Sequence, residues 1–219
     1  KQKDIEGKFN SQFDLSGKEI NKLVATSNII FLEKNNLSVK GSLLHSFKFK
    51  LDENFKLVDY NYKSNGKISE SQIDFKENFK NQFVEKPIKK FLISKANISI
   101  NLNKQKNNFL MLEGLYNLGS TDNKKFKISN DLNKKNSKYL VDFDLAENII
   151  LEFINFKSDF KKGSNIKSEI NFINNEIIFK YIKFIEDKNL ISINNLKLNK
   201  KKKLAAVSAI EVVTYNNNQ

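Results

Sequence analysis

Several residue types are scarce or missing in this chain of 219 residues, and each absence removes a class of function. Without cysteine there are no disulfide bonds and no thiolate chemistry, and the compartment stays open. No apolar run approaches the ~20 residues of a membrane span. The sequence also contains no glycine-rich phosphate loop, metal-ligand cluster or nucleophile elbow. We therefore expect neither an enzyme nor a cofactor.

Arginine is missing as well, so all 38 basic side chains are lysines, and the formal net charge is +13. Such a charge favours acidic partners, although nucleic-acid sites usually use arginine for bidentate contacts with phosphate and guanine. Lys, Asn, Ile and Phe all have A/T-rich codons, so a biased genome explains the same composition. Phe47 and Phe49 also alternate with Lys48 and Lys50, which puts rings and charges on opposite sides of a strand. We expect no nucleic-acid partner and a lysine-coated outer face.

What the chain does contain is period-two alternation of apolar and polar residues, the pattern of a half-buried strand. Asp4–Leu15 and Leu37–Leu51 alternate in this way, and shorter examples are Ile98–Leu102, Tyr139–Leu145 and Ile166–Phe172. At ~3.4 Å per residue, Leu37–Leu51 would span roughly 50 Å, beyond the usual strand of ~3–10 residues. Strands of that length predict an elongated sheet.

Asn-rich and Lys-rich segments separate these strands and predict short hairpin turns, because asparagine tolerates the left-handed backbone conformation. Short turns between consecutive strands predict an antiparallel meander. The single proline, Pro87, leaves the sheet ladders uninterrupted. The predicted turns are Asp52-Glu53-Asn54, Asn65-Gly66, Gln105 to Asn108, Lys134 to Asn136, Asn174-Asn175, Asp187 to Asn189 and Lys200 to Lys203.

Helical signals are few, and we expect one or two short helices. Ser16 and Glu19 have the spacing of a capping box, with Ile20, Leu23 and Val24 behind them, although 24–32 fits a strand equally well. Phe79, Phe83, Ile88 and Phe91 follow helical spacing roughly, but Pro87 lies inside that window, so any helix there is short or broken.

The strand-like alternation begins at the first residues, and residue 1 is Lys rather than Met. We therefore interpret residues 1–219 as a single β-rich region and as a fragment of a longer, repetitive β protein.

The isolated polar residues fit structural roles better than catalytic ones. His45 shares an alternating face with Leu43 and Phe47, as a packed or groove-lining side chain would. Asp142 and Asp144 share a strand face, but Val141 and Phe143 occupy the opposite face, which makes the carboxylates solvent-facing.

The Phe- and Ile-rich faces have two interpretations. One is the packed core of a sandwich or closed barrel. The other is a curved, taco-like sheet whose inner face stays open as a groove for acyl chains; burying one methylene is worth ~0.8 kcal/mol, so a sixteen-carbon chain gains up to roughly 13 kcal/mol in gross transfer free energy. The residues that we expect to line the groove are Phe9, Phe13, Phe47, Phe49, Ile98, Ile100, Phe143, Ile170, Phe172, Ile178 and Ile182.

Residues 169–187 form an apolar stretch that lysines interrupt at positions 180 and 183. After the predicted turn at 174–175, strict alternation groups Ile178 and Ile182 with Phe184. It assigns Ile177, Phe179, Tyr181 and Ile185 to the opposite face, which then needs a cover.

The texture of long meandering strands resembles the AsmA-like family of bacterial envelope proteins, most closely in Ser164–Leu198, "SNIKSEINFINNEIIFKYIKFIEDKNLISINNLKL". The resemblance implies a periplasmic fragment of a protein that is anchored to the inner membrane by a segment outside this chain. It also implies a taco-shaped sheet that carries phospholipid acyl chains toward the outer membrane, and no catalytic residues.

Two other functions fit the same pattern. The chain could be a structural or adhesive β-sandwich or solenoid module without a ligand, or it could bind an anionic polymer through its lysine-rich face.

Overall fold

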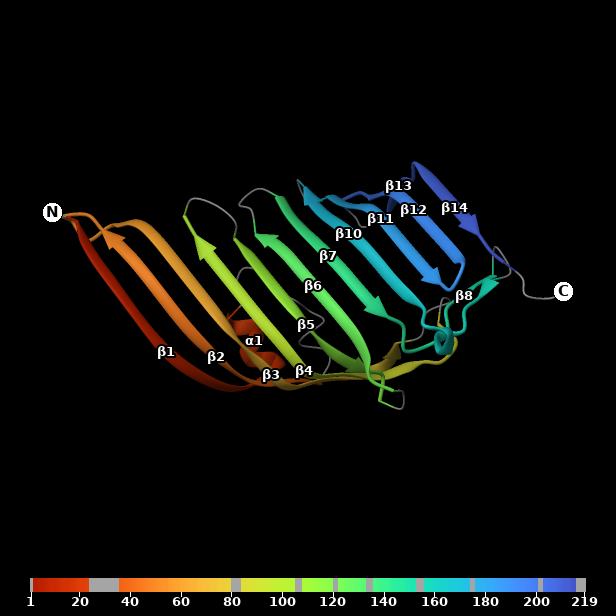
Figure 1. Ribbon diagram of the computed structural model, residues 1–219, viewed down its shortest axis with the longest axis horizontal. Helices are drawn as coiled ribbons and strands as arrows, with labels where there is room; N and C mark the ends of the chain where they lie inside the picture. Colours follow the sequence, from red (N-terminus) through yellow and green to blue (C-terminus); the bar gives the residue numbers. More distant parts are fainter. Residues whose placement is uncertain are drawn as a thin grey trace.

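A computed structural model describes residues 2–23, 36–79, 84–104, 108–119, 122–132, 136–152, 156–173, 176–200 and 203–215. Twelve strands of these residues form one large sheet (Figure 1). In the order of the sheet they are β1 (Lys3–Ser16), β2 (Asn36–Leu51), β3 (Leu57–Phe79), β4 (Ile88–Asn103), β5 (Phe109–Asn117), β6 (Lys124–Leu132), β7 (Asn136–Asp144), β10 (Asn165–Ile173), β11 (Glu176–Glu186), β12 (Asn189–Leu198) and β13 (Leu204–Ala206), with β14 (Ala209–Val213) also paired to β12.

Each neighbouring pair in this sheet is antiparallel, and neighbours in space are almost always neighbours in sequence. The mostly β, elongated antiparallel meander that the alternation predicts is therefore confirmed. One departure is between β7 and β10, where residues 145–164 hold a two-stranded sheet of β8 (Ile150–Leu151) and β9 (Phe156–Lys157) and the 3₁₀ turn η2 (Phe160–Lys162). The other is β14, which pairs with β12 and not with β13.

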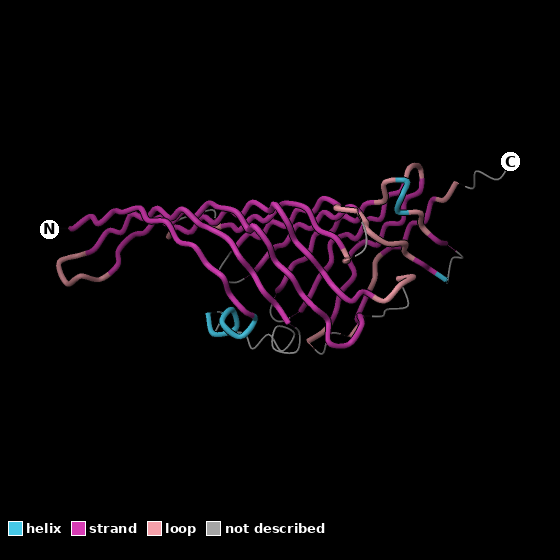
Figure 2. The backbone as a smooth tube through the Cα atoms, turned by 90° about the horizontal axis from the view of Figure 1, so that it is seen from below, coloured by secondary structure: helices cyan, strands magenta, loops and turns pink. Residues whose placement is uncertain are grey.

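The sheet is curved rather than flat. Figure 2 shows α1 (Gly17–Leu23) and the ends of the long strands on one side of the strand layer, away from the viewer of Figure 1. The end of β3 passes beneath the lower ends of β5, β6 and β7 toward β8 (Figure 1). The described part of the chain is thus an open, bent sheet with two free edges, β1 on one side and β13 and β14 on the other.

Helix α1 begins where the capping box predicts. The carboxylate of Glu19 accepts hydrogen bonds from the Ser16 amide and hydroxyl, each at 2.7 Å, and the bond from the amide lowers the pKa of Glu19. Residues 24–32, which fit either a helix or a strand, lie outside the described residues.

The rough helical spacing of Phe79, Phe83, Ile88 and Phe91 corresponds to no helix among the described residues. β3 runs to Phe79, Val84 makes an isolated antiparallel bridge, and β4 begins at Ile88, while Phe83 lies outside the described part. Pro87 precedes β4, where its missing amide costs no ladder bond. Phe91 therefore lies within strand β4, where successive side chains alternate between the two faces of the sheet.

The turn predictions had mixed outcomes. Asp52–Asn54 is a turn in which the Asp52 carboxylate accepts from the amides of Asn54 and Lys56, both at 2.9 Å. Asp187 takes a positive φ of 49° in the turn before β12. Most of the other Asn- and Lys-rich turns fall at least partly on residues outside the description.

The turn predicted at Asn65-Gly66 was wrong, because both residues lie inside β3. Gly66 pairs with Leu43 on one side and Ile98 on the other, and a Cβ there would collide with the carbonyl oxygen of Ser42. This glycine permits a close approach of two strands, and it makes no turn.

Candidate functional site

The sheet separates apolar from charged side chains, and the strand registers define the two faces, since directly paired residues point to the same side. One row of pairs starts at Ser11 on β1 and crosses the sheet to Ile210 on β14. Most residues of this row are aliphatic. Between its two ends the row contains Leu43, Gly66, Ile98, Leu112, Ile128, Val141, Ser168, Ile182 and Ile193. We call this side the apolar face.

Most of the predicted lining residues share that face. Phe9 pairs with His45 in a second row, which continues through Ile100 and ends at Leu196; Ile170 lies in the same row. The apolar face also contains Phe13, Phe47, Phe49, Ile98, Phe143, Phe172 and Ile182.

Ile178 differs from this prediction, because the structure places it on the opposite face from Ile182. The register between β10 and β11 shifts after Glu169: Ile170 pairs with Phe179, whereas Glu169 pairs with Tyr181, which leaves Lys180 as the extra residue of a β-bulge. On the apolar face, Ile182 is therefore joined by Phe179 and Ile177, while Ile178 pairs with Lys197. Strict alternation predicts that Phe179 and Ile177 lie on an opposite face that needs a cover. In the structure both residues lie on the apolar face.

Side chains on the apolar face converge, as they do on the inner side of a bend. Tyr116 on β5 reaches past β6, stacks edge-on against Phe143 of β7 at 5.2 Å, and donates its hydroxyl to the carbonyl of Asp144 at 2.6 Å. Phe126 and Phe143 stack at 5.5 Å, and Phe91 stacks on Tyr116 at 5.2 Å. The buried cluster around Ile68, Ala96, Tyr116, Phe126 and Ala146 is the core of the described residues.

The apolar face is open away from this core. Ile5 is 46% exposed and Phe9 is 50% exposed on β1, and Phe172 on β10 is 41% exposed. Phe47 stacks on Phe49 at 4.9 Å and continues the aromatic surface along β2. The apolar face is therefore packed as a core over β4–β7, and it carries exposed or partly exposed aromatic side chains on β1 and β2.

A small polar cluster interrupts the apolar face at β1–β3. His45 is only 7% exposed, and its ring nitrogens lie 2.7 Å from the Ser11 hydroxyl and 2.6 Å from the Tyr62 hydroxyl. Phe9 stacks on the His45 ring at 4.3 Å. Since both nitrogens are engaged and the ring is covered, the geometry fits the packed role, one of the two roles, packed or groove-lining, that the sequence predicts for His45.

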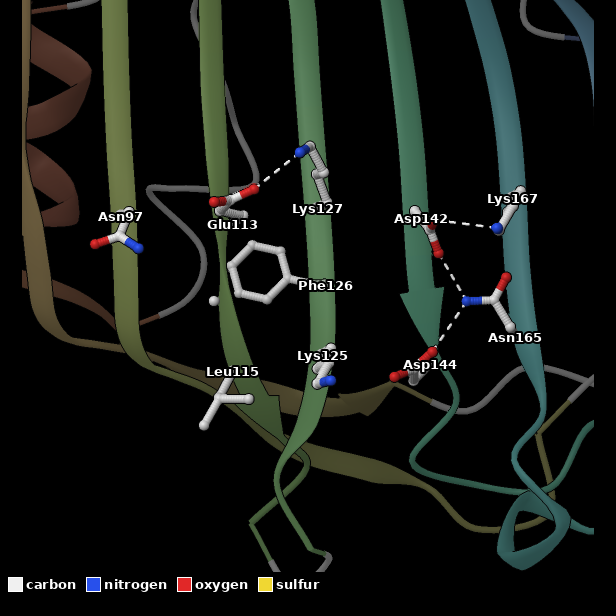
Figure 3. A pocket seen from close by; sticks show the side chains of 11 residues that line it. Asn97, Glu113, Leu115, Lys125, Phe126, Lys127, Asp142, Asp144, Asn165 and Lys167 are labelled. Carbon is white, nitrogen blue, oxygen red and sulfur yellow. Dashed lines mark hydrogen bonds and ion pairs between the residues drawn. The ribbon is translucent and has the colours of Figure 1, made fainter.

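The opposite face carries a ladder of alternating charges. Glu113, Lys127, Asp142 and Lys167 follow one another across β5, β6, β7 and β10, with ion pairs of 2.9 Å for Lys127–Glu113 and 3.5 Å for Lys167–Asp142. They border a hollow of about 500 Å³ (Figure 3). Asn165 bridges the carboxylates of Asp142 and Asp144 there, at 2.7 and 3.0 Å.

Cross-strand pairs also neutralise lysines elsewhere on this charged face, at Lys40–Asp14, Lys48–Glu6 and Lys90–Asp74. Leu44, which is 53% exposed, is one of several large apolar side chains on this face. Exposed pairs contribute little stability, about 0–1 kcal/mol each, but they give this face a mixed charge.

The connection between β7 and β10 covers part of the apolar face, and sequence reasoning missed it. Glu186 is 3% exposed, and its carboxylate accepts from the Asp159 amide and the Ser164 hydroxyl, both at 2.7 Å. Phe156 packs edge-on against Phe184 at 5.4 Å. No local pattern announces these contacts, because the partners lie more than twenty residues apart.

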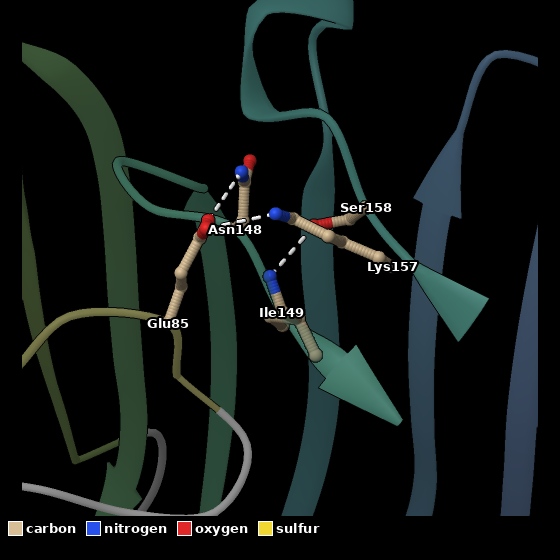
Figure 4. A network of polar contacts seen from close by, with 5 residues as sticks. All are labelled: Glu85, Asn148, Ile149, Lys157 and Ser158. Atoms are coloured by element: carbon tan, nitrogen blue, oxygen red, sulfur yellow. Dashed lines mark hydrogen bonds and ion pairs between the residues drawn. The ribbon is translucent and has the colours of Figure 1, made fainter. Parts of the chain in front are cut away.

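The same connection holds the segment before β4 through a group of contacts that we call the clasp: Val84, Glu85, Asn148, Ile149 and Lys157. Figure 4 shows the last four of these residues. Val84 bridges to Ile149, and the Glu85 carboxylate accepts from Lys157 at 2.7 Å and from Asn148 at 2.8 Å. The clasp thus joins the segment before β4 to the connection between β7 and β10.

The described residues contain no group of three or more His, Asp or Glu side chains that could hold a metal ion. Nor does any helix among them have the length and hydropathy of a membrane span. Comparison of the chain with protein-family models, curated protein sequences and solved structures gave no match.

Proposed function

We propose that this chain is a non-catalytic lipid-binding module whose apolar face holds phospholipid acyl chains. The observation that carries the proposal is the row of aliphatic side chains that crosses the sheet from β1 to β14, with Ile5 and Phe9 about half exposed at its open end. An exposed apolar surface such as the one around Ile5 and Phe9 is typical of a binding surface. Acyl chains suit it because they need burial and no specific polar contact.

The resemblance to the AsmA-like family extends this proposal to transport. The chain would be the periplasmic part of a longer protein that is anchored to the inner membrane by a segment outside this chain. Its curved sheet would form part of a path for phospholipid toward the outer membrane.

The charged face supports an anionic-polymer ligand less well. Several of its lysines lie beside Asp or Glu in cross-strand pairs, so a polyanion that follows these strands would meet carboxylates as well as lysines. A ligand-free structural module differs from the proposal in one observable respect, since it would not retain lipid.

Native mass spectrometry after mild extraction tests the proposal. We expect co-purified phospholipid, and we expect the double variant Ile5→Gln, Phe9→Gln to retain less of it. Leu44→Gln is the matched control, because it removes an exposed apolar side chain from the opposite face. Equal lipid content in all three proteins, or a folded protein without lipid, overturns the proposal. Salt-sensitive retention on an anionic polymer in the absence of lipid favours the charged face instead.

A further inference from the structure

The two edges of the sheet are built differently. At one edge, β13 has three residues and β14 has five, so the edge is short and broken. At the other, β1 has 14 residues, contains no proline, and pairs with β2 in continuous register. Natural sheets protect their edges with short strands, bulges, prolines or inward charges, because an exposed ladder of amides and carbonyls pairs with other strands.

No strand among the described residues pairs with the outer edge of β1, which is the outermost strand in Figure 1. Its apolar side is also uncovered there, at Ile5 and Phe9. We infer that β1 is a dimerisation edge, on which a second copy of this chain adds its own β1 in antiparallel orientation. A two-fold axis perpendicular to the sheet joins the two apolar faces into one surface.

The sequence of β1 selects the register of this pairing. When two copies of β1 pair antiparallel about a two-fold axis, the numbers of any two residues that face each other add to the same sum. The apolar residues of β1 have odd numbers, so an even sum keeps the two apolar faces on the same side. A sum of 22 places Ser11 on the axis, Phe9 opposite Phe13 of the second copy, and Lys8 opposite Asp14 of the second copy. Both contacts occur twice, and residues 6–16 overlap.

Registers with smaller sums bring like charges together, and a sum of 24, which opposes no like charges, pairs no opposite charges either. A sum of 16 opposes Lys8 to Lys8, a sum of 18 opposes Asp4 to Asp14, and a sum of 20 opposes Glu6 to Asp14. Like charges directly across a strand pair are destabilising. A sum of 14 also pairs opposite charges, Glu6 with Lys8, and it places Ile5 opposite Phe9. It overlaps fewer residues, however, and leaves both Phe13 and Leu15 outside the pairing.

The ion pair already present supports the chosen register. Asp14 lies 3.2 Å from Lys40 of β2, and the side chains are 67% and 51% exposed. Lys8 of the second copy would approach Asp14 from the other side, and the carboxylate would lie between two cations. The row Lys40, Asp14, Lys8 then continues the alternation of charge that crosses the charged face at Glu113, Lys127, Asp142 and Lys167.

Analytical ultracentrifugation of the full chain tests the inference. We expect a concentration-dependent dimer. Lys8→Asp and Asp14→Lys should each weaken it about tenfold, and the double exchange Lys8→Asp, Asp14→Lys should restore it, because opposite charges face each other again. Glu6→Lys is the control, since Glu6 faces Ser16 in this register. A monomer at all concentrations overturns the inference, and loss of the dimer in Glu6→Lys but not in Asp14→Lys overturns the register.

Cross-linking gives a second readout that does not depend on the charges. The chain has no cysteine, so Ser11→Cys introduces a single thiol on the proposed axis. We expect a covalent dimer on oxidation, and none for Ser42→Cys, which lies on the charged face of β2 inside the sheet. No covalent dimer from Ser11→Cys in a sample that sediments as a dimer overturns the register, and equal cross-linking of both variants overturns the edge assignment.

Discussion

At the scale of single residues, Tyr116 joins the packing of the core to hydrogen bonding. Its ring contacts Phe91, Phe126 and Phe143, and its hydroxyl donates to the backbone of Asp144 at 2.6 Å. A buried hydroxyl with a partner contributes about 0.5–1.5 kcal/mol, and the partner left behind adds a desolvation cost.

We expect Tyr116→Phe to lower the free energy of unfolding by about 1 kcal/mol in urea denaturation. Tyr215→Phe is the control, because that side chain is exposed. Equal effects of the two substitutions would contradict the role of the Tyr116 hydroxyl.

Burial raises the pKa of Tyr116 from 10.0 to about 12. The folded state therefore binds the phenolic proton more tightly than the unfolded state, so this contribution to stability is complete below pH 10 and is lost as the pH rises toward 12. In an ultraviolet titration of the tyrosines, the wild-type protein should show one step near pH 12 that the Tyr116→Phe variant lacks. A component near 10 would contradict the burial.

At the scale of elements, the bulge in β11 decides which isoleucines lie on the apolar face. Ile182 pairs with Ser168 and Ile193 on the apolar face, whereas Ile178 pairs with Asn171 and Lys197 on the charged face. Threonine preserves β-branching, so a substitution to threonine changes burial without changing strand propensity much.

We therefore expect Ile182→Thr to cost about 1–2 kcal/mol of unfolding free energy and Ile178→Thr less than about 0.5 kcal/mol. Urea denaturation of the two variants provides the comparison. A larger loss of unfolding free energy in Ile178→Thr than in Ile182→Thr would mean that strict alternation holds and that the bulge is absent.

The clasp is the second feature at this scale, because it joins elements that are more than sixty residues apart. Hydrogen bonds from Lys157 and Asn148 lower the pKa of Glu85 below its ordinary value of 4.5. A lowered carboxylate pKa means that the contact is complete above pH 4.5 and is lost as the pH falls through the lowered value.

Glu85→Gln should therefore speed the hydrogen exchange of the Ile149 and Ser158 amides, whose bonds hold the connection next to the clasp. Glu6→Gln is the control, since it alters an exposed ion pair on β1 far from this region. Unchanged exchange in Glu85→Gln would show that the Val84–Ile149 bridge suffices.

At the scale of the whole molecule, the packed core and the proposed lipid-binding surface occupy different parts of one face. Phe126 is 4% exposed in the core, whereas Phe9 lies at the open edge. Phe126→Ala should cost about 3–5 kcal/mol of unfolding free energy, and Phe9→Ala about 1 kcal/mol or less. Urea denaturation at a concentration where the chain is monomeric provides the measurement. Similar losses would mean that the whole face is a packed core.

The sequence by itself determined the faces wherever strands are regular. Alternation alone assigned Phe9, Phe47, Ile98, Phe143 and Ile170 to one side, because the side-chain period of a strand is fixed by backbone geometry. The same local logic located the capping box at Ser16 and Glu19.

Only the tertiary structure decided the face of Ile178, the interior position of Gly66 and the burial of Glu186. A bulge inverts the alternation beyond it without leaving a pattern in the sequence, and a glycine that admits a neighbouring strand looks like a turn. Glu186 and the clasp depend on partners brought together by the bend of the sheet. These partners are distant in the sequence, so no local pattern contains the contacts.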